Sequence, residues 1–547
     1  MSDLGFTGAF YMSRSRAVNA QECVNWYPEL THSIIDSPAR MYHDKAKADL
    51  VLYPTPGLRY FCKLPNNKAT RGCYVTSNNR MFYVAGNTLY EVSPYGKITT
   101  WGTLEGGTST RVSFADNGVG VDQPITYIDS NGNTQNTGEY KGLGMIMVDG
   151  FNGYLFNLTT NTLQKITGGY FPVVMTGYTE PTYGYFPQAT HVCFIGGKFV
   201  VNEINTQKFY WSNLYDGFHW DPLNYSSAES MADNISAIAS LNGDLWLVGT
   251  QSVEIWRDTG GTSASYTSSA IPTAGAFSAM HGAVTTNGTI APYSVVSSGQ
   301  YLFWLGSSAQ GHGQVWQTNN YQPMKISTTS IDYITETTPN IKDAIGFTYT
   351  QSGHQFYILT FQQGNRTFCF DCNIVSGQQG MWHERGDWNQ QTGHMDRHYA
   401  NSYMFFLDRV YCGDYRNGNV YVLDDKYYLD NSEIVRRVRS GAHIHQERKR
   451  LYFHNVEIDF ERGVGASDPV SGPDQSIDPQ AMLQWSDDGG FTWSNEVWKT
   501  FGEVGQYKAR LKYTRMGMSR DRIFRLTVSD PNKCVLIAAN ADITAER

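Results

Sequence analysis

Three short segments carry the side chains that bind metals or transfer protons. In the first, His394, Asp396 and His398 alternate along the chain, so on a strand they would share one face and hold a metal ion. They follow a polar, glycine-containing run from Gln390 to Gly393, which is typical of a solvated loop between two structural units. The sequence therefore predicts a loop here and leaves an ion site as the alternative.

The second segment holds two cysteines and the third an acid–base pair. Cys369 and Cys372 fall in an expected strand, where positions three apart point to opposite faces, and no second Cys-x-x-Cys accompanies them. We interpret them as core thiols. His383 and Glu384 have the types of a general acid or base, but no partner nucleophile is visible. We therefore predict no catalytic residue, no metal site and no cofactor.

A polar turn near the C-terminus has a mechanical explanation. Residues 486–493 read SDDGGFTW, an Asp-box-like S-x-D-x-G-x-T-W pattern. An aspartate in such a turn accepts hydrogen bonds from nearby backbone N–H groups, glycine tolerates the left-handed position, and the tryptophan packs under the hairpin. The residues predicted to build the turn are Ser486, Asp488, Gly490, Thr492 and Trp493. Glycosidase propellers carry this box on several blades, whereas one full match indicates a structural role.

Strongly cationic segments lie on both sides of this turn. Lys508, Arg510 and Lys512 alternate with apolar and aromatic residues, so a strand there would have one basic face. Three interpretations stay open: a solvated face with local ion pairs, a protein interface that pairs arginines with carboxylates, and DNA contact. The candidate interface residues are Arg436, Arg437, Arg439, Lys508, Arg510, Lys512, Arg515, Arg520, Arg522 and Arg525.

Length and composition favour an all-β protein with more than one domain. The chain has 547 residues, more than one hydrophobic core usually serves, and it is rich in Gly (53), Tyr (36), Phe (27) and Trp (13). Eight scattered cysteines do not form the disulfide framework of a small secreted protein. No apolar run approaches the roughly 20 residues of a membrane span. We expect a soluble protein that is made in a cytoplasm and does not insert into membranes.

Charge is distributed unevenly along the chain. The formal net charge is −8; residues 431–547 hold 17 Lys/Arg and 16 Asp/Glu, which gives +1 and leaves −9 for residues 1–430. A negative chain of this kind is not expected to bind nucleic acid unspecifically. The acidic and the near-neutral parts are expected to face different neighbours.

A recurring hairpin predicts the architecture of the middle of the chain. The paired segments are Met81–Val84 with Thr88–Val92, Gly144–Val148 with Tyr154–Leu158, His191–Ile195 with Lys198–Val201, Ile235–Ser240 with Asp244–Val248, Tyr293–Val296 with Tyr301–Leu305, Phe356–Phe361 with Arg366–Cys372, and Tyr403–Leu407 with Val420–Leu423. Turns such as Asn242-Gly243, Gly196-Gly197 and Asn417-Gly418 are expected to supply positive φ. A period of roughly 50 residues is typical of propeller blades, which must stack around an axis to bury their faces. The prediction is a β-propeller of about seven blades.

Composition shifts divide the chain into three parts. Residues 1–60, with Pro28, Pro38, Pro54 and Pro56, are predicted to form an extended arm that packs against another domain or subunit. Residues 61–430 form the propeller, and an arginine-rich stretch then marks a boundary. Residues 431–547 are predicted to form a β-sandwich-like assembly domain. Its expected strands are Tyr452–Phe460, Met482–Trp485, Tyr507–Tyr513 and Ile523–Val528, with a loop from Gly463 to Pro479.

Both ends of the chain resemble one known family. Residues 19–29 read NAQECVNWYPE, with Asn25, Trp26, Tyr27, Pro28 and Glu29 as the recognisable core. This run resembles the opening signature of the packaged-DNA stabilisation proteins, the tail hub or nozzle proteins of short-tailed bacteriophages. The stretch from Trp485 to Arg525 resembles the closing signature, W-S-D-D-G-G-x-T-W, then G-x-x-G-x-Y-x-x-R, then R-x-G-x-x-R-D-R.

The resemblance implies a non-enzymatic virion component of the tail, placed below the portal and its adaptor protein. Six copies would form a homohexameric ring that seals the packaged genome and lets DNA pass transiently and unspecifically during ejection. Tail fibres or spikes and a tail needle or tip would bind to its surfaces. An acidic body is compatible with a conduit, because it repels phosphates.

Two other classes of function stay open. The Asp box and the many aromatic residues are also compatible with a glycan-binding or sialidase-like, glycan-hydrolysing propeller. Composition alone is also compatible with a cellular scaffolding propeller, which leaves the two terminal signatures unexplained.

Overall fold

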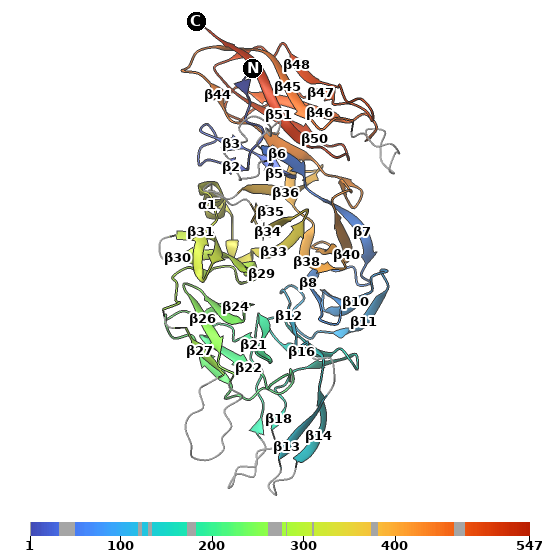
Figure 1. Cartoon of the computed structure of the whole chain (residues 1–547), viewed down its shortest axis with the longest axis vertical. Helices are drawn as coiled ribbons and strands as arrows, with labels where there is room; N and C mark the ends of the chain where they lie inside the picture. The colour runs from blue at the N-terminus through green and yellow to red at the C-terminus, as the bar shows by residue number, and fades with distance from the viewer. Residues whose placement is uncertain are drawn as a thin grey trace, which may run out of the picture.

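The chain forms a ring of β-sheets with a two-sheet sandwich at one end, and both termini lie at the sandwich end (Figure 1). The computed structural model describes residues 2–31, 50–118, 123–128, 134–171, 182–260, 276–280, 282–308, 311–373, 381–463 and 476–546. Residues 32–49, which include Pro38, and residues 464–475 of the expected loop lie outside the described residues. No helix among the described residues is long and apolar enough to cross a membrane.

Seven blades make up the ring, each a mostly antiparallel meander of neighbouring strands. Blades one to three comprise β8 (Thr70–Val75), β9 (Met81–Ala85), β10 (Thr88–Val92) and β11 (Ile98–Thr103); β12 (Ser113–Asp116), β15 (Gly144–Val148), β16 (Gly153–Asn157) and β17 (Thr162–Lys165); and β20 (Val192–Ile195), β21 (Lys198–Asn202), β22 (Lys208–Trp211) and β23 (Tyr225–Ser227). Blade four comprises β24 (Ile235–Leu241), β25 (Asp244–Gly249), β26 (Val253–Asp258) and β27 (Phe277–Ala279). The all-β propeller prediction is confirmed.

The remaining blades lie nearer the sandwich (Figure 1). Blade five comprises β28 (Gly288–Thr289), β29 (Val296–Ser298), β30 (Tyr301–Ser308), β31 (Gly311–Asn319) and β32 (Gln322–Lys325). Blade six comprises β33 (Ile345–Gln351), β34 (His354–Phe361), β35 (Arg366–Asp371) and β36 (Trp382–Asn389), and blade seven comprises β38 (Ala400–Phe406), β39 (Arg409–Asp414), β40 (Asn419–Asp424) and β7 (Gly57–Lys63). One helix that the sequence reading missed, α1 (Thr329–Thr337), follows blade five and is capped by the Thr328 hydroxyl.

The last blade of the ring is completed by a strand from the N-terminal part of the chain. The innermost strands of successive blades contact one another all the way round, in the order β8, β12, β20, β24, β29, β33, β38 and back to β8. Strand β7 pairs with β40 as the outer strand of blade seven. Residues 57–60, expected in the arm, therefore belong to the propeller. Closure protects the blades from edge-to-edge pairing.

Turn chemistry explains most of the hairpins. Asn242 (φ 54°) and Gly243 (φ 82°) make the two-residue turn between β24 and β25, and Gly196 and Gly197 do the same between β20 and β21. The expectation for Asn417-Gly418 was wrong. Residues 415–418 form a four-residue connection between β39 and β40, so no positive φ is needed there. The expected pairing of residues 403–407 with 420–423 was also wrong, because β39 lies between them.

The sandwich contains strands from both ends of the chain. One sheet has the order β48 (Leu511–Thr514), β45 (Leu451–Phe460), β51 (Leu536–Ala545), β6 (Leu50–Pro54) and β5 (Trp26–Leu30), joined by β1 (Ser2–Asp3) and β49 (Met518–Ser519). The other has the order β4 (Cys23–Val24), β43 (Arg437–Ser440), β50 (Asp521–Val528), β46 (Gln480–Ser486) and β47 (Val497–Thr500). The N-terminal segment is thus built into the sandwich.

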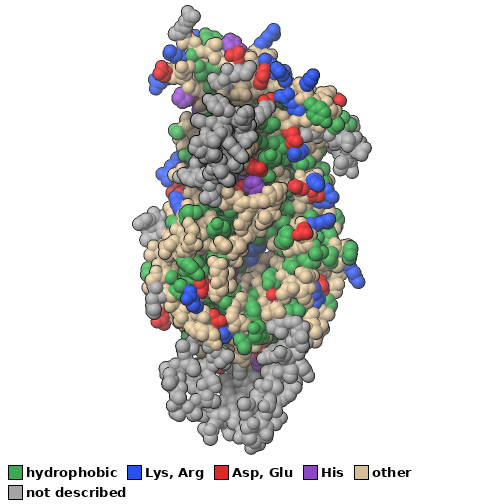
Figure 2. Space-filling model, in the orientation of Figure 1, with side chains coloured by type: hydrophobic (Ala, Val, Ile, Leu, Met, Phe, Trp, Pro, Cys, Tyr) green, Lys and Arg blue, Asp and Glu red, His purple; other side chains and the backbone are tan. Residues whose placement is uncertain are grey.

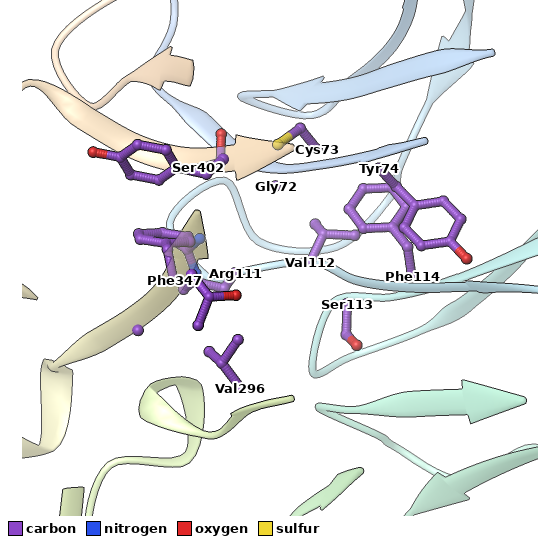
Figure 3. Close-up of a pocket in the computed structure, with 13 residues that line it drawn as sticks. Gly72, Cys73, Tyr74, Arg111, Val112, Ser113, Phe114, Val296, Phe347 and Ser402 are labelled. Atoms are coloured by element: carbon purple, nitrogen blue, oxygen red, sulfur yellow. The ribbon is translucent and has the colours of Figure 1, made fainter. Parts of the chain in front are cut away.

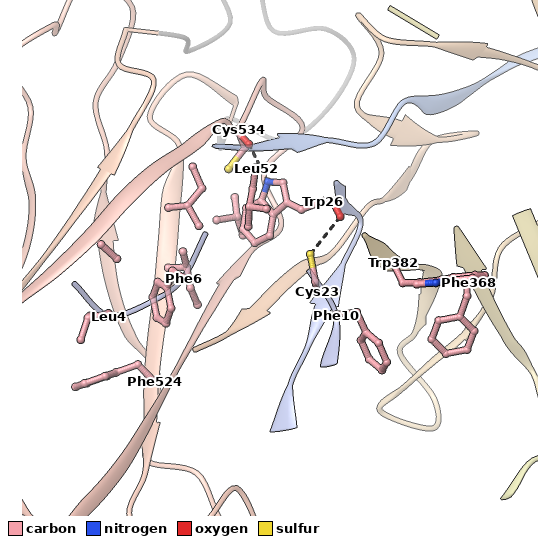
Figure 4. Packing of buried hydrophobic residues seen from close by; sticks show 14 of the residues in the cluster. Leu4, Phe6, Phe10, Cys23, Trp26, Leu52, Phe368, Trp382, Phe524 and Cys534 are labelled. Atoms are coloured by element: carbon pink, nitrogen blue, oxygen red, sulfur yellow. Dashed lines mark hydrogen bonds between the residues drawn. The ribbon is translucent and has the colours of Figure 1, made fainter. Parts of the chain in front are cut away.

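The propeller and the sandwich share one sheet and one core. Val24 of β4 pairs with Glu384 of blade six on one side and with Val438 of β43 on the other, so an 11-stranded sheet runs from the propeller into the sandwich. A single apolar cluster includes Phe368 of blade six and Phe524 of the sandwich, and Figure 4 shows how residues of the two domains pack around Trp26 and Phe10. Both backbone hydrogen bonds and apolar packing therefore join the two domains.

Candidate structural site at the propeller–sandwich junction

Asn25 connects three parts of the junction. Its side-chain amide donates to the carbonyl oxygens of Gly386 in blade six and Arg436 before β43, both at 2.8 Å, and its side-chain oxygen accepts from the Gly386 N–H at 3.1 Å. The residue has φ 58°, a left-handed conformation that asparagine adopts more readily than most residues. Side-chain and backbone demands at this position therefore both favour asparagine.

The residues after Asn25 extend the junction in two directions. Trp26 is fully buried, and its indole N–H donates to the Cys534 carbonyl at 2.8 Å (Figure 4). Tyr27 packs edge-on against Phe356 of blade six. Pro28 lies in the edge strand β5, where a missing N–H is tolerated.

Glu29 completes a charged bridge to blade six. Its carboxylate lies 3.3 Å from His354 Nε2, and His354 Nδ1 lies 2.7 Å from the buried Asp371 carboxylate. The hydrogen bond to Asp371, with the nearby Glu29 charge, raises the pKa of His354 above its usual value. Sequence reasoning missed His354 and Asp371, because nothing in the local sequence links residues more than 300 positions from Glu29.

Two of the predicted interface arginines are buried inside the chain instead. Arg439 has no exposed surface and donates to the carbonyl oxygens of Phe6, Ala9 and Glu22 at 2.6–3.2 Å. It also donates to Gln21 Oε1 at 2.9 Å, so one guanidinium organises the N-terminal segment. Arg437 is equally buried and donates to the Asp530 carbonyl oxygen at 3.3 Å. The expectation of a partner contact was wrong for both, because every residue of β43 is buried and both guanidinium groups bond to carbonyl oxygens of the same chain.

Arg522, a third candidate interface residue, is also buried within the chain. It is 2% exposed and forms a two-bond fork with the Asp487 carboxylate, both N···O distances being 2.7 Å. Its guanidinium also lies over the Phe453 ring at 4.7 Å. Arg522 is therefore paired with a carboxylate of the polar turn in the same chain. The prediction that it pairs with a carboxylate of a partner was wrong.

Two further candidates stack on tryptophans of the same chain. Arg525 lies over Trp493 at 3.8 Å, and Arg436 lies over Trp388 at 4.0 Å with Glu496 3.6 Å away. Both arginines are half-buried, so each has only part of its surface left for a partner.

The polar turn has the hydrogen bonds that its sequence predicts. Asp488 accepts from the backbone N–H groups of Phe491 and Thr492 at 3.0 Å, and the Ser486 hydroxyl donates to it at 2.6 Å. These bonds lower the pKa of Asp488. Gly490 has φ 90°. The turn lies in the sandwich, after β46, and not on a blade, which removes the feature that suggested a glycan-active propeller.

The other cationic candidates are exposed, apart from the half-exposed Lys512, and the expected strand from Tyr507 to Tyr513 does not form over its whole length. Strand β48 begins at Leu511, so Lys508 and Arg510 lie in the irregular segment before it. Gly502 and Gly505 adopt positive φ in this segment. Lys512 in β48 pairs with Glu457 at 2.7 Å. Arg515 and Arg520 are exposed at the end of the sandwich. Partner contact at these exposed positions stays a prediction.

The candidate metal and acid–base residues do not converge. His394 to Arg397 forms a short strand, β37, paired with β36, so the expectation of a loop was wrong. His394 is exposed, whereas His398 is buried and lies 3.1 Å from the Tyr403 hydroxyl. No group of three His, Cys, Asp or Glu side chains is arranged to hold a metal ion in the described part of the chain.

Cys369 and the acid–base pair are buried, and Cys372 is partly buried. Burial raises the pKa of the Cys369 thiol to about 12 and lowers the pKa of His383 to about 3. Glu384 forms a two-bond fork with Arg366 at 2.7 Å. The ion pair between Glu384 and Arg366 therefore stabilises blade six where Glu384 pairs with β4.

Together these features define a structural protein in which a closed propeller and a sandwich are joined by a shared sheet and by buried arginines. Comparison with known protein families gives two matches. Residues 40–428 match the model of the bacteriophage P22 Gp10 β-propeller, and residues 436–544 match that of the bacteriophage P22 Gp10 β-sandwich. The chain belongs to this family of phage tail proteins, which stabilise packaged DNA.

Other comparisons add little. No curated protein matches the chain in sequence. Among solved structures, the computationally designed Ika8 protein is 12% identical and covers 67% of this chain and 99% of its own, with a TM-score of 0.32. The N-terminal domain of Nup159 is 8% identical and covers 70% of this chain and 97% of its own, with a TM-score of 0.33. Neither likeness is close enough to support an argument.

Proposed function

We propose that this chain is the hub or nozzle subunit of a short phage tail, below the portal and adaptor. Six copies form a ring that retains the packaged DNA and conducts it during ejection. The ring also binds tail fibres or spikes and a tail needle or tip. The family membership supports the tail role, and the shared sheet supports a unit that transmits force without a hinge.

One exposed surface supports assembly most directly. Tyr452 and Met518 are paired across β45 and β49 and are 40% and 53% exposed. Exposed basic side chains flank them. We call this set the rim patch: Arg448, Lys449, Arg450, Tyr452, Met518 and Arg520. Figure 2 shows Lys and Arg side chains at this end of the molecule. Tyrosine, methionine and arginine are the residues enriched in protein interfaces.

Charge indicates which surface the rim patch would meet. Residues 1–430 carry −9, so the propeller of the next copy is an acidic partner for the basic side chains of the rim patch. Contact between two different surfaces of one chain repeats around a circle and produces a closed ring. The same acidic body would repel DNA phosphates wherever it lines the channel, which favours passage over retention by binding.

Ring assembly is testable with purified full-length chain and portal–adaptor complexes. We expect mass photometry and electron microscopy to show a six-fold ring on the complex. A variant with Arg448→Glu, Lys449→Glu and Arg520→Glu should fold but fail to join it. The control carries Lys68→Glu, Lys97→Glu and Lys342→Glu, three exposed propeller positions with the same change in charge. A wild-type chain that stays monomeric and never enters the complex would overturn the proposal.

A further inference from the structure

A cavity of about 310 Å³ lies at the axis of the propeller. It is lined by the inner strands of five blades: β8, β12 with the residues just before it, β29, β33 and β38. Figure 3 shows Arg111 beside Phe347 at one side of this space, with Ser113 and Val296 below and Cys73 and Ser402 above. This space is separate from the junction and from the rim patch.

Arg111 brings a positive charge into this cavity without an acidic partner. Its Nη2 donates to the Asn401 carbonyl at 2.8 Å, and its guanidinium lies over the Phe347 ring at 5.0 Å. Its Nη1 is buried and has no hydrogen-bond partner in the described part of the chain. No ion pair joins Arg111 to a carboxylate among the described residues. Burial lowers its pKa to about 10, so the group remains protonated at neutral pH.

The neighbouring Arg71 has the hydrogen bonds and the opposite charge that Arg111 lacks. Arg71, on β8, is more deeply buried than the half-buried Arg111, but its guanidinium donates to the Gly86 carbonyl at 2.8 Å and to the Thr110 hydroxyl at 2.7 Å. The Asp149 carboxylate lies 3.9 Å away and supplies the opposite charge. Arg111 has no such counter-charge, although leaving a charged donor such as its buried Nη1 unpaired is unfavourable.

We propose that the axial cavity binds a compact oxyanion, such as phosphate, sulfate or a short carboxylate, through Arg111. The planar guanidinium matches the oxygen geometry of these anions. Ser113 supplies a second donor, because its oxygen already accepts the Val192 N–H at 3.2 Å and its own proton is left to donate into the cavity. The volume exceeds that of one water and suits a tetrahedral anion. This site belongs to each single chain and does not depend on ring assembly.

The experiment titrates inorganic phosphate into full-length chain at constant ionic strength and follows thermal unfolding and heat of binding. Wild type should show a saturable rise in Tm of about 2 °C or more, because a ligand that binds only the folded state stabilises it. Arg111→Met should abolish the rise and keep or increase Tm in phosphate-free buffer, since the unpaired charge is gone. Arg111→Lys, which keeps the charge and loses the fork, should bind about tenfold more weakly.

The control is Arg520→Gln, an exposed arginine outside the cavity, which should respond as wild type does. Sulfate and acetate at matched ionic strength distinguish the anions that fit. An equal rise in Arg111→Met, or no heat and no rise in wild type, would overturn the proposal. If Arg111→Met does not fold, the same comparison between wild type and Arg111→Lys decides, because an unchanged affinity there also overturns it.

Discussion

The junction and the rim patch contain the same kind of residue in opposite environments. Arg437, Arg439 and Arg522 are at most 2% exposed and are bonded to carbonyl oxygens or to a carboxylate of the same chain. Arg448 and Arg520 are exposed. A buried charge is costly to leave unpaired, whereas an exposed one contributes little to folding. The arginines of the junction therefore maintain the fold, and those of the rim patch are available to a partner.

The largest effect is expected when Arg439 is removed. Arg439→Met leaves the carbonyl oxygens of Phe6, Ala9 and Glu22 without their donor. We expect the free energy of unfolding to fall by about 3–5 kcal/mol and the N-terminal segment to become sensitive to protease. Urea unfolding and limited proteolysis measure the two effects. Arg448→Met at the rim should change stability by less than about 0.5 kcal/mol. If Arg439→Met and Arg448→Met lower the free energy of unfolding equally, the buried and the exposed arginines do not differ in their contribution to the fold.

Asn25 tests the junction without changing a charge. Asn25→Ala loses three side-chain hydrogen bonds and puts alanine at φ 58°, a left-handed conformation that alanine adopts less readily than asparagine. The expected loss is about 2–4 kcal/mol in urea unfolding. Asn25→Gly keeps the backbone conformation and loses the same bonds, so it should cost about 1 kcal/mol less. If the glycine variant is as stable as wild type, the hydrogen bonds do not hold the junction.

A smaller effect is expected at the polar turn of the sandwich. Asp488→Asn weakens the bonds to the Thr492 hydroxyl and backbone. Because the folded-state pKa of Asp488 is lowered, its stabilisation is present at neutral pH and is lost as pH falls below its usual value. The Tm of the variant should thus lie below that of wild type at pH 7, and the gap should begin to narrow as pH falls below about 4, the usual pKa of an aspartate. A gap independent of pH would show that the charge has no role.

Local patterns predicted the blades better than the junction. The hairpins around Asn242 and Gly196 follow from turn chemistry that acts over a few residues, so the sequence alone locates them. Arg439 shows what a local sequence pattern cannot predict. Its alternation with neighbours predicts a face, but whether that face meets solvent or residues 5–22 depends on contacts more than 400 positions away. Arg111 had no local signal, because its missing counter-charge is visible only when the blades close.

The smallest effect concerns the pH dependence of the contact between Glu29 and blade six. Protonated His354 bridges the Asp371 and Glu29 carboxylates, and its folded-state pKa is raised above 6.5. Its stabilisation is therefore fully present below pH 6.5 and is lost as pH rises through the folded-state pKa. We expect wild type to exceed His354→Gln in stability by at most about 1 kcal/mol at pH 6, and by less at pH 8.5.

Urea unfolding at the two pH values measures this difference, with His445→Gln as the control at an exposed histidine of the rim side. The control should show no pH-dependent difference from wild type. Tyr27 and Phe356 pack against the His354 ring, so the glutamine variant also loses aromatic contacts, and this loss is the same at both pH values. The part of the difference that disappears at high pH therefore isolates the charge. A difference that grows with pH would mean that His354 is neutral in the folded chain and that Glu29 contacts blade six without a charged bridge.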